Sequence, residues 1–284
     1  MAELLKGKPV ADAIDLNIRN ETKALKEKGI VPFLAVFRVG ERNDDLSYER
    51  GILKKCEKTG IRMVSYVFDQ DVPEDEFYAK LQEANEDPAI HGILVFRPLP
   101  KRFNDETVRN RIRAEKDIDG CSDLSLAGVF TGKDLGYAPC TAQAVIEILD
   151  YYGIDVSGSN VTVLGRSLVI GRPVSMLLMH RNATVTICHT RSRNTAQIAS
   201  KADILVCATG QMESVTDDYV NKDQTVIDVG IGWNEQKQKL CGDVSFENAE
   251  PLVRAVTPVP GGVGSVTTCV LADHVLEAAR RTLG

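Results

Sequence analysis

The feature that most constrains the fold is a regular alternation of short apolar runs with longer amphipathic segments. In the first half of the chain this pattern predicts strands at 33–39, 63–68 and 92–95 and helices at 11–28, 47–59 and 73–85. Strands joined through helices run parallel, because each connection must cross back over the sheet. The alternation therefore predicts an α/β fold built from mostly parallel sheets with helices on both faces.

A second series of the same kind begins after Pro139. The expected strands are 160–164, 184–188, 204–208 and 225–229, and the expected helices are 142–152, 173–181, 194–201 and 269–283. The glycine-rich polar stretch 128–136 is the expected seam, and the last helix is expected to pack back on the first series. We therefore predict two domains, 1–139 together with 268–284, and 140–267 as a Rossmann-type nucleotide-binding domain.

Composition excludes several classes of protein. The net charge of −6 argues against nucleic acid or an anionic membrane as a general partner. No apolar run approaches a membrane span, and the N-terminal residues lack a signal-peptide core, so we expect a soluble, cytoplasmic protein. The seven cysteines are scattered and odd in number, which indicates reduced thiols, and the four histidines are not at metal-ligand spacing, so no metal site is expected.

Residues 256–268 form an unusual loop of two prolines and three glycines interleaved with valines. Pro258 and Pro260 fix φ, whereas Gly261, Gly262 and Gly264 can reach positive φ. A flexible linker would instead carry solvated polar residues. The composition favours a shaped loop whose backbone approaches a ligand, and a tight structural corner is the alternative.

The turn from 165 to 173, Gly-Arg-Ser-Leu-Val-Ile-Gly-Arg-Pro, lies between the first strand and the next helix of the second series. This is where a doubly wound sheet binds phosphates, because the amides of the helix N-terminus face the turn. The generic G-x-G-x-x-G fingerprint is absent, but the strand before, the helix after and Pro173 near the helix start favour a phosphate-binding turn.

The following strand ends in Cys188-His189-Thr190-Arg191-Ser192-Arg193 and not in a carboxylate. A carboxylate would accept from the ribose 2′-hydroxyl of NAD, whereas two arginines and two hydroxyls suit a 2′-phosphate. The pattern favours NADP, with NAD as the alternative, unless the arginines only form a solvated helix start. Residues 208–210 and 228–231 follow later strands at the same ligand-binding edge.

Several motifs together resemble one family over essentially the full length, the methylenetetrahydrofolate dehydrogenase/methenyltetrahydrofolate cyclohydrolase proteins of one-carbon metabolism. The motifs that carry the resemblance are Pro32–Val36 with Gly40, Ser47-Tyr48, Cys56-Glu57 with Gly60, Gly92–Val95 with Pro98-Leu99-Pro100, Lys116–Gly120, Pro139-Cys140-Thr141, Gly165-Arg166-Ser167 with Gly171 and Pro173, Cys188-His189, Gly242-Asp243-Val244 and the 258–264 loop.

The resemblance implies a tetrahydrofolate derivative as substrate, held in a cleft between the two domains, an NAD(P) cofactor on the second domain, and a homodimer. It identifies Asp119 as the residue that binds the pterin, and a carboxylate suits the paired N–H donors of that ring. It identifies Tyr48 as the tyrosine near the reacting centre and Pro260, Gly261, Gly262 and Val263 as the loop over the substrate. The cofactor-binding residues expected are Gly165, Arg166, Ser167, Gly171, Pro173, His189, Thr190, Arg191, Ser192, Arg193, Thr209, Gly210, Ile231 and Thr268.

The chain departs from the family pattern where the cyclohydrolase residues are expected. Bifunctional members have a lysine four residues after the tyrosine, where this chain has Ile52, and a glutamine before the Pro-Leu-Pro motif, where it has Phe96. Lys54 lies on another helix face, and Lys55 lies about 10 Å along the axis from Tyr48. We therefore expect a dehydrogenase with weak or absent cyclohydrolase activity. The alternatives are the full bifunctional enzyme and a silent folate- or nucleotide-binding protein.

Overall fold

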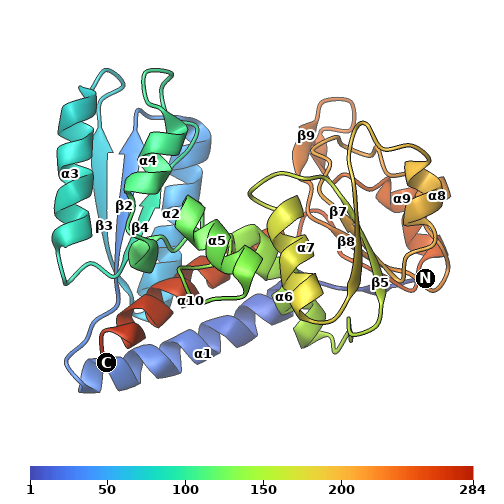
Figure 1. Ribbon diagram of the computed structural model, residues 1–284, viewed down its shortest axis with the longest axis horizontal. Helices are drawn as coiled ribbons and strands as arrows, with labels where there is room; N and C mark the ends of the chain where they lie inside the picture. The colour runs from blue at the N-terminus through green and yellow to red at the C-terminus, as the bar shows by residue number, and fades with distance from the viewer. Residues whose placement is uncertain (284) are drawn as a thin grey trace. The chain divides into compact units, whose positions relative to one another are not determined.

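The computed structural model describes residues 1–283 and divides the chain into two compact units. One unit contains residues 13–140 and 268–284, and the other contains residues 1–12 and 141–267. The expected α/β class is confirmed, because each unit contains a parallel sheet with helices packed on it (Figure 1).

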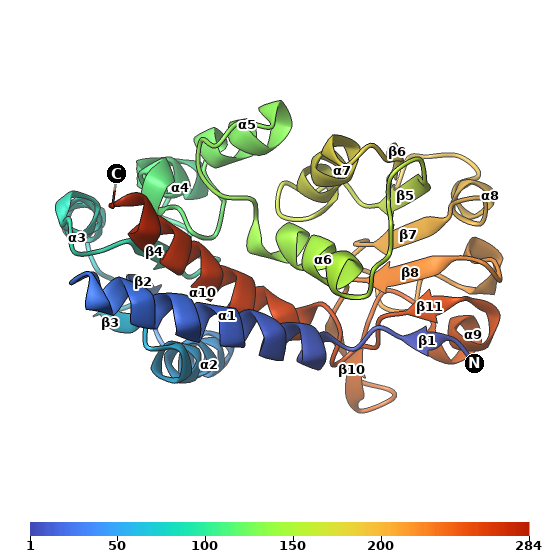
Figure 2. The same cartoon turned by 90° about the horizontal axis from the view of Figure 1, so that it is seen from below.

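The unit of residues 13–140 and 268–284 is built on a three-stranded parallel sheet in the order β3-β2-β4. Its strands are β2 (Phe33–Val39), β3 (Arg62–Phe68) and β4 (Gly92–Val95). Its helices are most of α1 (Gly7–Glu27), α2 (Asn43–Thr59), α3 (Glu74–Glu86), α4 (Asp105–Arg111), the 3-10 turn η1 (Ala114–Lys116), α5 (Asp123–Thr131) and most of α10 (Gly264–Arg281). Within this unit α1 and α10 lie side by side in both ribbon views (Figures 1 and 2).

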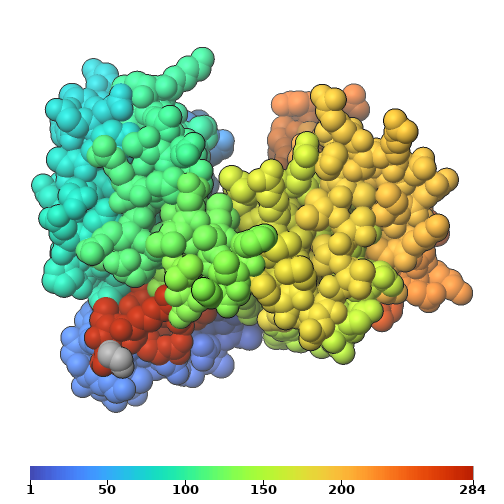
Figure 3. All heavy atoms as spheres, in the orientation of Figure 1, coloured from blue at the N-terminus to red at the C-terminus, as the bar shows by residue number. Residues whose placement is uncertain are grey.

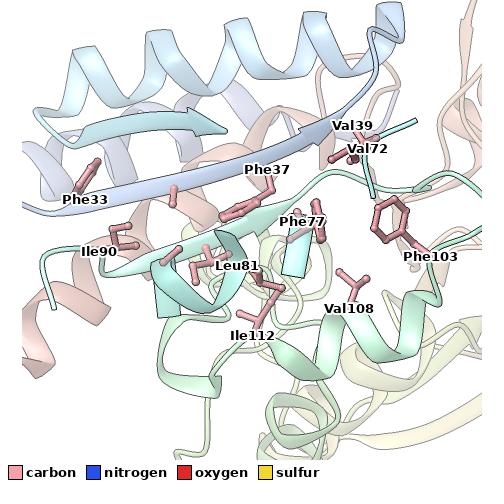
Figure 4. Close-up of a cluster of buried hydrophobic side chains, with 14 residues drawn as sticks. Phe33, Phe37, Val39, Val72, Phe77, Leu81, Ile90, Phe103, Val108 and Ile112 are labelled. Carbon is pink, nitrogen blue, oxygen red and sulfur yellow. The ribbon is translucent and has the colours of Figure 1, made fainter. Parts of the chain in front are cut away.

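One hydrophobic cluster of this unit lies between the sheet and helices α3 and α4. Phe37 is fully buried and packs edge-on against Phe77, which in turn contacts Phe103. The close-up shows these rings beside Leu81 and Ile112, between strand and helix (Figure 4). In the space-filling view, the α3 and α4 side is one continuous surface in turquoise and green (Figure 3).

The unit of residues 1–12 and 141–267 contains a six-stranded, all-parallel sheet in the order β1-β11-β8-β7-β5-β6. Its strands are β1 (Glu3–Leu4), β5 (Asn160–Leu164), β6 (Thr184–Cys188), β7 (Ile204–Cys207), β8 (Thr225–Asp228) and β11 (Ala255–Val256), with the antiparallel pair β9 (Gly232–Asn234) and β10 (Lys239–Cys241) beside it. Its helical elements are nearly all of α6 (Cys140–Tyr151), α7 (Gly171–His180), α8 (Thr195–Ala199), η2 (Asp217–Tyr219), α9 (Phe246–Ala249) and η3 (Glu250–Leu252).

Two expectations about the domain limits differ from the structure. Residues 1–12, grouped by sequence with the first domain, lie in the six-stranded unit because β1 pairs with β11. The stretch 128–136 is not a seam, because α5 extends to Thr131 and the division falls at Cys140 and Thr141. Residues 268–284 share a unit with residues 13–140.

Candidate active site

The turn between β5 and α7 is tight because two glycines let backbone segments approach closely. Gly165 has φ +121°, and a Cβ there would lie 2.1 Å from the Ala208 carbonyl oxygen. A Cβ on Gly171, where α7 begins, would lie 2.3 Å from the Gly165 oxygen. The Ser167 hydroxyl accepts from the Ile170 amide at 3.1 Å. The turn therefore brings backbone, not side chains, to the carboxyl edge of the sheet.

A cavity of about 410 Å³ opens at this edge. Its lining comes from the ends of β5, β6 and β7 and the loops that follow them: Leu164, Gly165, Arg166, Ser167, Cys188, His189, Thr190, Ser192, Thr195, Ala208, Thr209, Gln211, Ser214, Val215 and Tyr219. A pocket outside the carboxyl ends of parallel strands is the usual ligand site of an open α/β sheet.

The structure brings together seven of the expected cofactor residues in this cavity: Gly165, Arg166, Ser167, His189, Thr190, Ser192 and Thr209. Arg191 and Arg193 are exposed on the turn after β6 and are not among its lining residues, nor are Gly171, Pro173 and Gly210. That turn is closed by three hydrogen bonds: from the His189 amide to the Ser192 hydroxyl at 3.0 Å, from the Arg191 amide to the His189 ring at 3.2 Å, and from the Ser192 amide to the His189 carbonyl at 2.8 Å.

Two buried carboxylates behind the cavity hold its loops, and sequence reasoning missed them. Asp243 accepts from the amides of Thr209 at 2.5 Å and Gly210 at 3.1 Å. Asp228 accepts from three amides, among them those of Gly230 and Asp243, both at 3.0 Å. Burial raises the pKa of Asp228 to about 7, although these amides oppose the shift. The Gly-Asp-Val motif at 242–244 was a sequence signal, but not of this role.

A second cavity of about 250 Å³ lies in the same unit, between the segment 228–231 and the loop 258–265. The expected substrate-loop residues Pro260, Gly261, Gly262 and Val263 and the expected cofactor residue Ile231 line it. A Cβ on Gly262 would lie 2.5 Å from the Pro258 oxygen, so the loop is folded closely on itself. Thr268, also expected near the cofactor, lies in α10 within the other unit.

In the other unit, the expected folate residues Tyr48 and Asp119 contact an aromatic ring and a guanidinium. The rings of Tyr48, on α2, and Phe96, just after β4, pack with centroids 5.5 Å apart. Arg97 Nη2 donates to Asp119 Oδ2 at 3.2 Å, and its Nη1 lies 3.8 Å from Asp105. Sequence reasoning missed this ion pair, because Arg97 and Asp119 come together only in the folded chain.

Ionisation in this cluster follows from burial and charge. Burial raises the pKa of Tyr48, and Asp119 and Cys140 raise it further, so the phenol stays neutral at physiological pH. Burial raises the pKa of Asp119 to about 6, while Arg97 lowers it and Asp117 raises it.

Neither Ile52 nor Lys55 is placed to act as an acid or base beside Tyr48. Ile52 is 1% exposed and belongs to the core. Lys55 donates to Asp15 Oδ1 at 2.5 Å and to the Cys269 sulfur at 3.0 Å. Burial alone would lower the pKa of Lys55, but these partners raise it, so its ammonium is held at Asp15.

Within residues 1–283 no helix is long and apolar enough to cross a membrane. The same residues contain no group of three or more His, Cys, Asp or Glu side chains arranged to hold a metal ion.

These features define a two-unit α/β protein whose six-stranded unit has a Rossmann-type nucleotide-binding edge. Residues 139–283 match the family described as tetrahydrofolate dehydrogenase/cyclohydrolase, NAD(P)-binding domain, and residues 5–119 match the catalytic domain of the same family. The chain belongs to the tetrahydrofolate dehydrogenase/cyclohydrolase family, which confirms the resemblance.

Known relatives match over nearly their full length. The bifunctional protein FolD of Alkaliphilus oremlandii is 48% identical over 99% of this chain and 98% of its own. The crystal structure of the bifunctional FolD enzyme of Campylobacter jejuni matches with a TM-score of 0.96 at 32% identity, covering 99% of this chain and all of that one. The Trypanosoma brucei enzyme complexed with NADP and an inhibitor matches with a TM-score of 0.92 at 32% identity, covering 99% and 98%.

Proposed function

We propose that this protein is a 5,10-methylenetetrahydrofolate dehydrogenase that transfers hydride to NADP and forms 5,10-methenyltetrahydrofolate. The observation that carries the proposal is the match of both units to one enzyme family, together with a cavity at the nucleotide-binding edge of the six-stranded sheet. The Campylobacter jejuni enzyme, at 32% identity, is named a methylenetetrahydrofolate dehydrogenase/cyclohydrolase, and the relative at 48% identity is named a bifunctional FolD protein.

The turn beside the cavity has the features that suit the phosphates of a dinucleotide. Gly165 and Gly171 leave backbone where side chains would otherwise stand, so phosphates can approach the amides at the start of α7. We assign the pyrophosphate to Gly165, Arg166 and Ser167. We assign the ribose side to His189, Thr190 and Ser192, with Arg191 and Arg193 facing a 2′-phosphate. Gly171 and Pro173 shape the turn. We assign Thr209 and Gly210 to the middle of the ligand and Ile231 to its nicotinamide end, and a role for Thr268 stays a prediction.

The nicotinamide, when bound, supplies the chemistry by accepting hydride at its C4 carbon. The protein then needs only to bind both ligands, align the two carbons and exclude water. We propose that Asp119 binds the pterin and that Tyr48 packs beside the reacting centre. The loop Pro260–Val263 is assigned to cover the ligands. Asp119 suits the pterin because a carboxylate accepts two neighbouring N–H groups.

We further propose that cyclohydrolase activity is weak or absent. Hydrolysis of the methenyl cation needs a positioned water and a group that moves protons, and hydride transfer needs neither. At the two positions where the resemblance expects lysine and glutamine, Ile52 is a core residue and the Phe96 ring packs on Tyr48. Three basic residues could replace the lost groups: Lys55, Arg97 and Arg50. Lys55 is engaged with Asp15 and Arg97 with Asp119, and Arg50 is exposed.

The alternative function is the full bifunctional enzyme, which the names of the relatives favour. A protein that only binds folate and nucleotide is the third candidate, and the intact features of both sites argue against it. A homodimer and a cytoplasmic location stay predictions.

Hydrolysis of purified methenyltetrahydrofolate tests the cyclohydrolase proposal, at a pH where spontaneous hydrolysis is slow. We expect a rate near the rate without protein, because loss of a general acid–base group costs about 10²–10⁴-fold. Clear acceleration by the wild-type protein overturns the proposal. The double variant Ile52→Lys with Phe96→Gln is expected to gain hydrolysis, and Phe96→Gln alone, which leaves the helix core intact, is its control.

A further inference from the structure

Among the described residues, Arg97 is the one charged side chain that forms a direct ion pair with Asp119. The guanidinium reaches Asp119 Oδ2 at 3.2 Å, with side chains 25% and 30% exposed. Its other nitrogen lies 3.8 Å from Asp105, which is 58% exposed. Arg97 therefore lies between two carboxylates, but it is closer to the less exposed one.

The other titratable groups around the pair do not replace this cation. They come from α2, α4, the turn of Asp119, α6 and α10: Tyr48, Asp105, Asp117, Cys121, Cys140 and His274. Asp117 opposes ionisation of Asp119, and the neutral Cys140 thiol donates to the Ile118 carbonyl at 3.2 Å. Burial lowers the pKa of His274, whose ring lies 3.7 Å from the Cys140 sulfur. Arg97 is thus the group that offsets burial of the Asp119 charge.

The ion pair also leaves hydrogen-bond acceptor capacity on the Asp119 carboxylate. Only Oδ2 accepts from Arg97, and each carboxylate oxygen can accept more than one hydrogen bond. Two neighbouring N–H donors of a pterin are matched only by the ionised form, because a protonated carboxyl presents one of its two oxygens as a donor. Whatever keeps Asp119 ionised therefore controls the pH range in which folate binds.

We propose that Arg97 is a positioning residue for folate binding, which holds the Asp119 carboxylate charged and oriented and so sets the pH below which folate affinity is lost. This inference rests on the proposed role of Asp119 as the pterin-binding residue. It adds a residue of this chain that the resemblance does not include.

The direction of the effect follows from the charges. Burial raises the pKa of Asp119 to about 6 although Arg97 lowers it, so we expect folate binding to decline progressively as the pH falls through this region. Removing the guanidinium removes both its charge and its hydrogen bond, which lower the pKa of Asp119. An opposite charge within about 4–6 Å lowers a carboxyl pKa by about 1–3 units, so its loss moves the acid limit upward by about that amount.

The experiment records kcat/KM for methylenetetrahydrofolate at saturating NADP between pH 5 and 9, for wild type, Arg97→Met and Arg97→Lys. The Kd of tetrahydrofolate over the same range, measured by calorimetry, makes the test independent of turnover. In wild type we expect folate affinity and kcat/KM to fall on the acid side with a midpoint near pH 6, which we call the acid limb. The midpoint is expected at least about one pH unit higher in Arg97→Met and between the two in Arg97→Lys. Arg113→Met, which removes an exposed guanidinium of the same unit, is expected to leave the limb in place.

Two outcomes separate the failures. If Arg97→Met is folded, as judged by thermal denaturation, and its acid limb coincides with that of wild type, Arg97 does not have this role. A uniform loss at every pH points to a purely structural role and equally overturns the inference. Asp119→Asn is expected to weaken folate binding and abolish the limb; unchanged folate affinity in that variant contradicts the proposed role of Asp119 itself.

Discussion

Charged residues are placed differently in the two candidate sites. In the candidate folate site, Asp119 is partly buried and forms an ion pair with Arg97 at 3.2 Å. At the nucleotide edge, Arg191 and Arg193 are exposed and lie on a turn whose backbone is fixed by His189 and Ser192. Exposed guanidiniums on a fixed turn are suited to an anionic group that arrives with the ligand.

Replacing Arg191 and Arg193 by alanine tests the proposed choice of NADP. We expect the KM for NADP to rise and that for NAD to change little, because only NADP carries the 2′-phosphate. The loss for NADP is expected at about 1.5–3 kcal/mol per charged hydrogen bond removed. Steady-state kinetics with each nucleotide measure this, with Lys201→Ala as a control for the loss of an exposed cation in the same unit. Equal use of NAD and NADP by the wild type contradicts the prediction.

Most elements could be predicted from apolar periodicity, since the expected strands 33–39, 92–95, 160–164 and 184–188 coincide with those in the structure. The short strands β1 and β11 could not be predicted, because two residues are too few to show the alternation of apolar and polar residues. Each is recognised as a strand only by its pairing in the sheet. The acceptor roles of Asp228 and Asp243 depend on loops that meet only in the folded sheet. Arg97 was missed for the same reason, since its partner is 22 residues away.

The β5–α7 turn is the element on which nucleotide binding depends most. For Gly165→Ala we expect the KM for NADP to rise more than about tenfold, about 1.4 kcal/mol, because the new Cβ would displace the Ala208 carbonyl from the cavity edge. Gly153→Ala is the matched control: Gly153 also has positive φ, but its Cβ would meet nothing within 4 Å. Both variants are expected to lose stability from backbone strain, about 1–3 kcal/mol, in thermal denaturation. A normal KM in folded Gly165→Ala would show that the turn does not contact the nucleotide.

At the scale of the whole molecule, the two candidate ligand sites belong to different units of one chain. Both units match the same enzyme family, so neither site is an isolated binding module. The proposed dehydrogenase uses both, whereas the cyclohydrolase step would depend on the cluster of Tyr48, Ile52 and Phe96 alone. The two activities can therefore be separated in one reaction mixture.

The most direct measurement follows reduced nucleotide and methenyltetrahydrofolate in the same samples over time, starting from methylenetetrahydrofolate and NADP and correcting for spontaneous hydrolysis. A dehydrogenase without cyclohydrolase activity produces the two in equal amounts throughout, since nothing in the protein removes the methenyl product. A bifunctional enzyme would make methenyltetrahydrofolate fall progressively behind the reduced nucleotide, which would contradict the proposed loss of hydrolysis. Absence of any reduced nucleotide, with NADP or with NAD, would contradict the dehydrogenase itself.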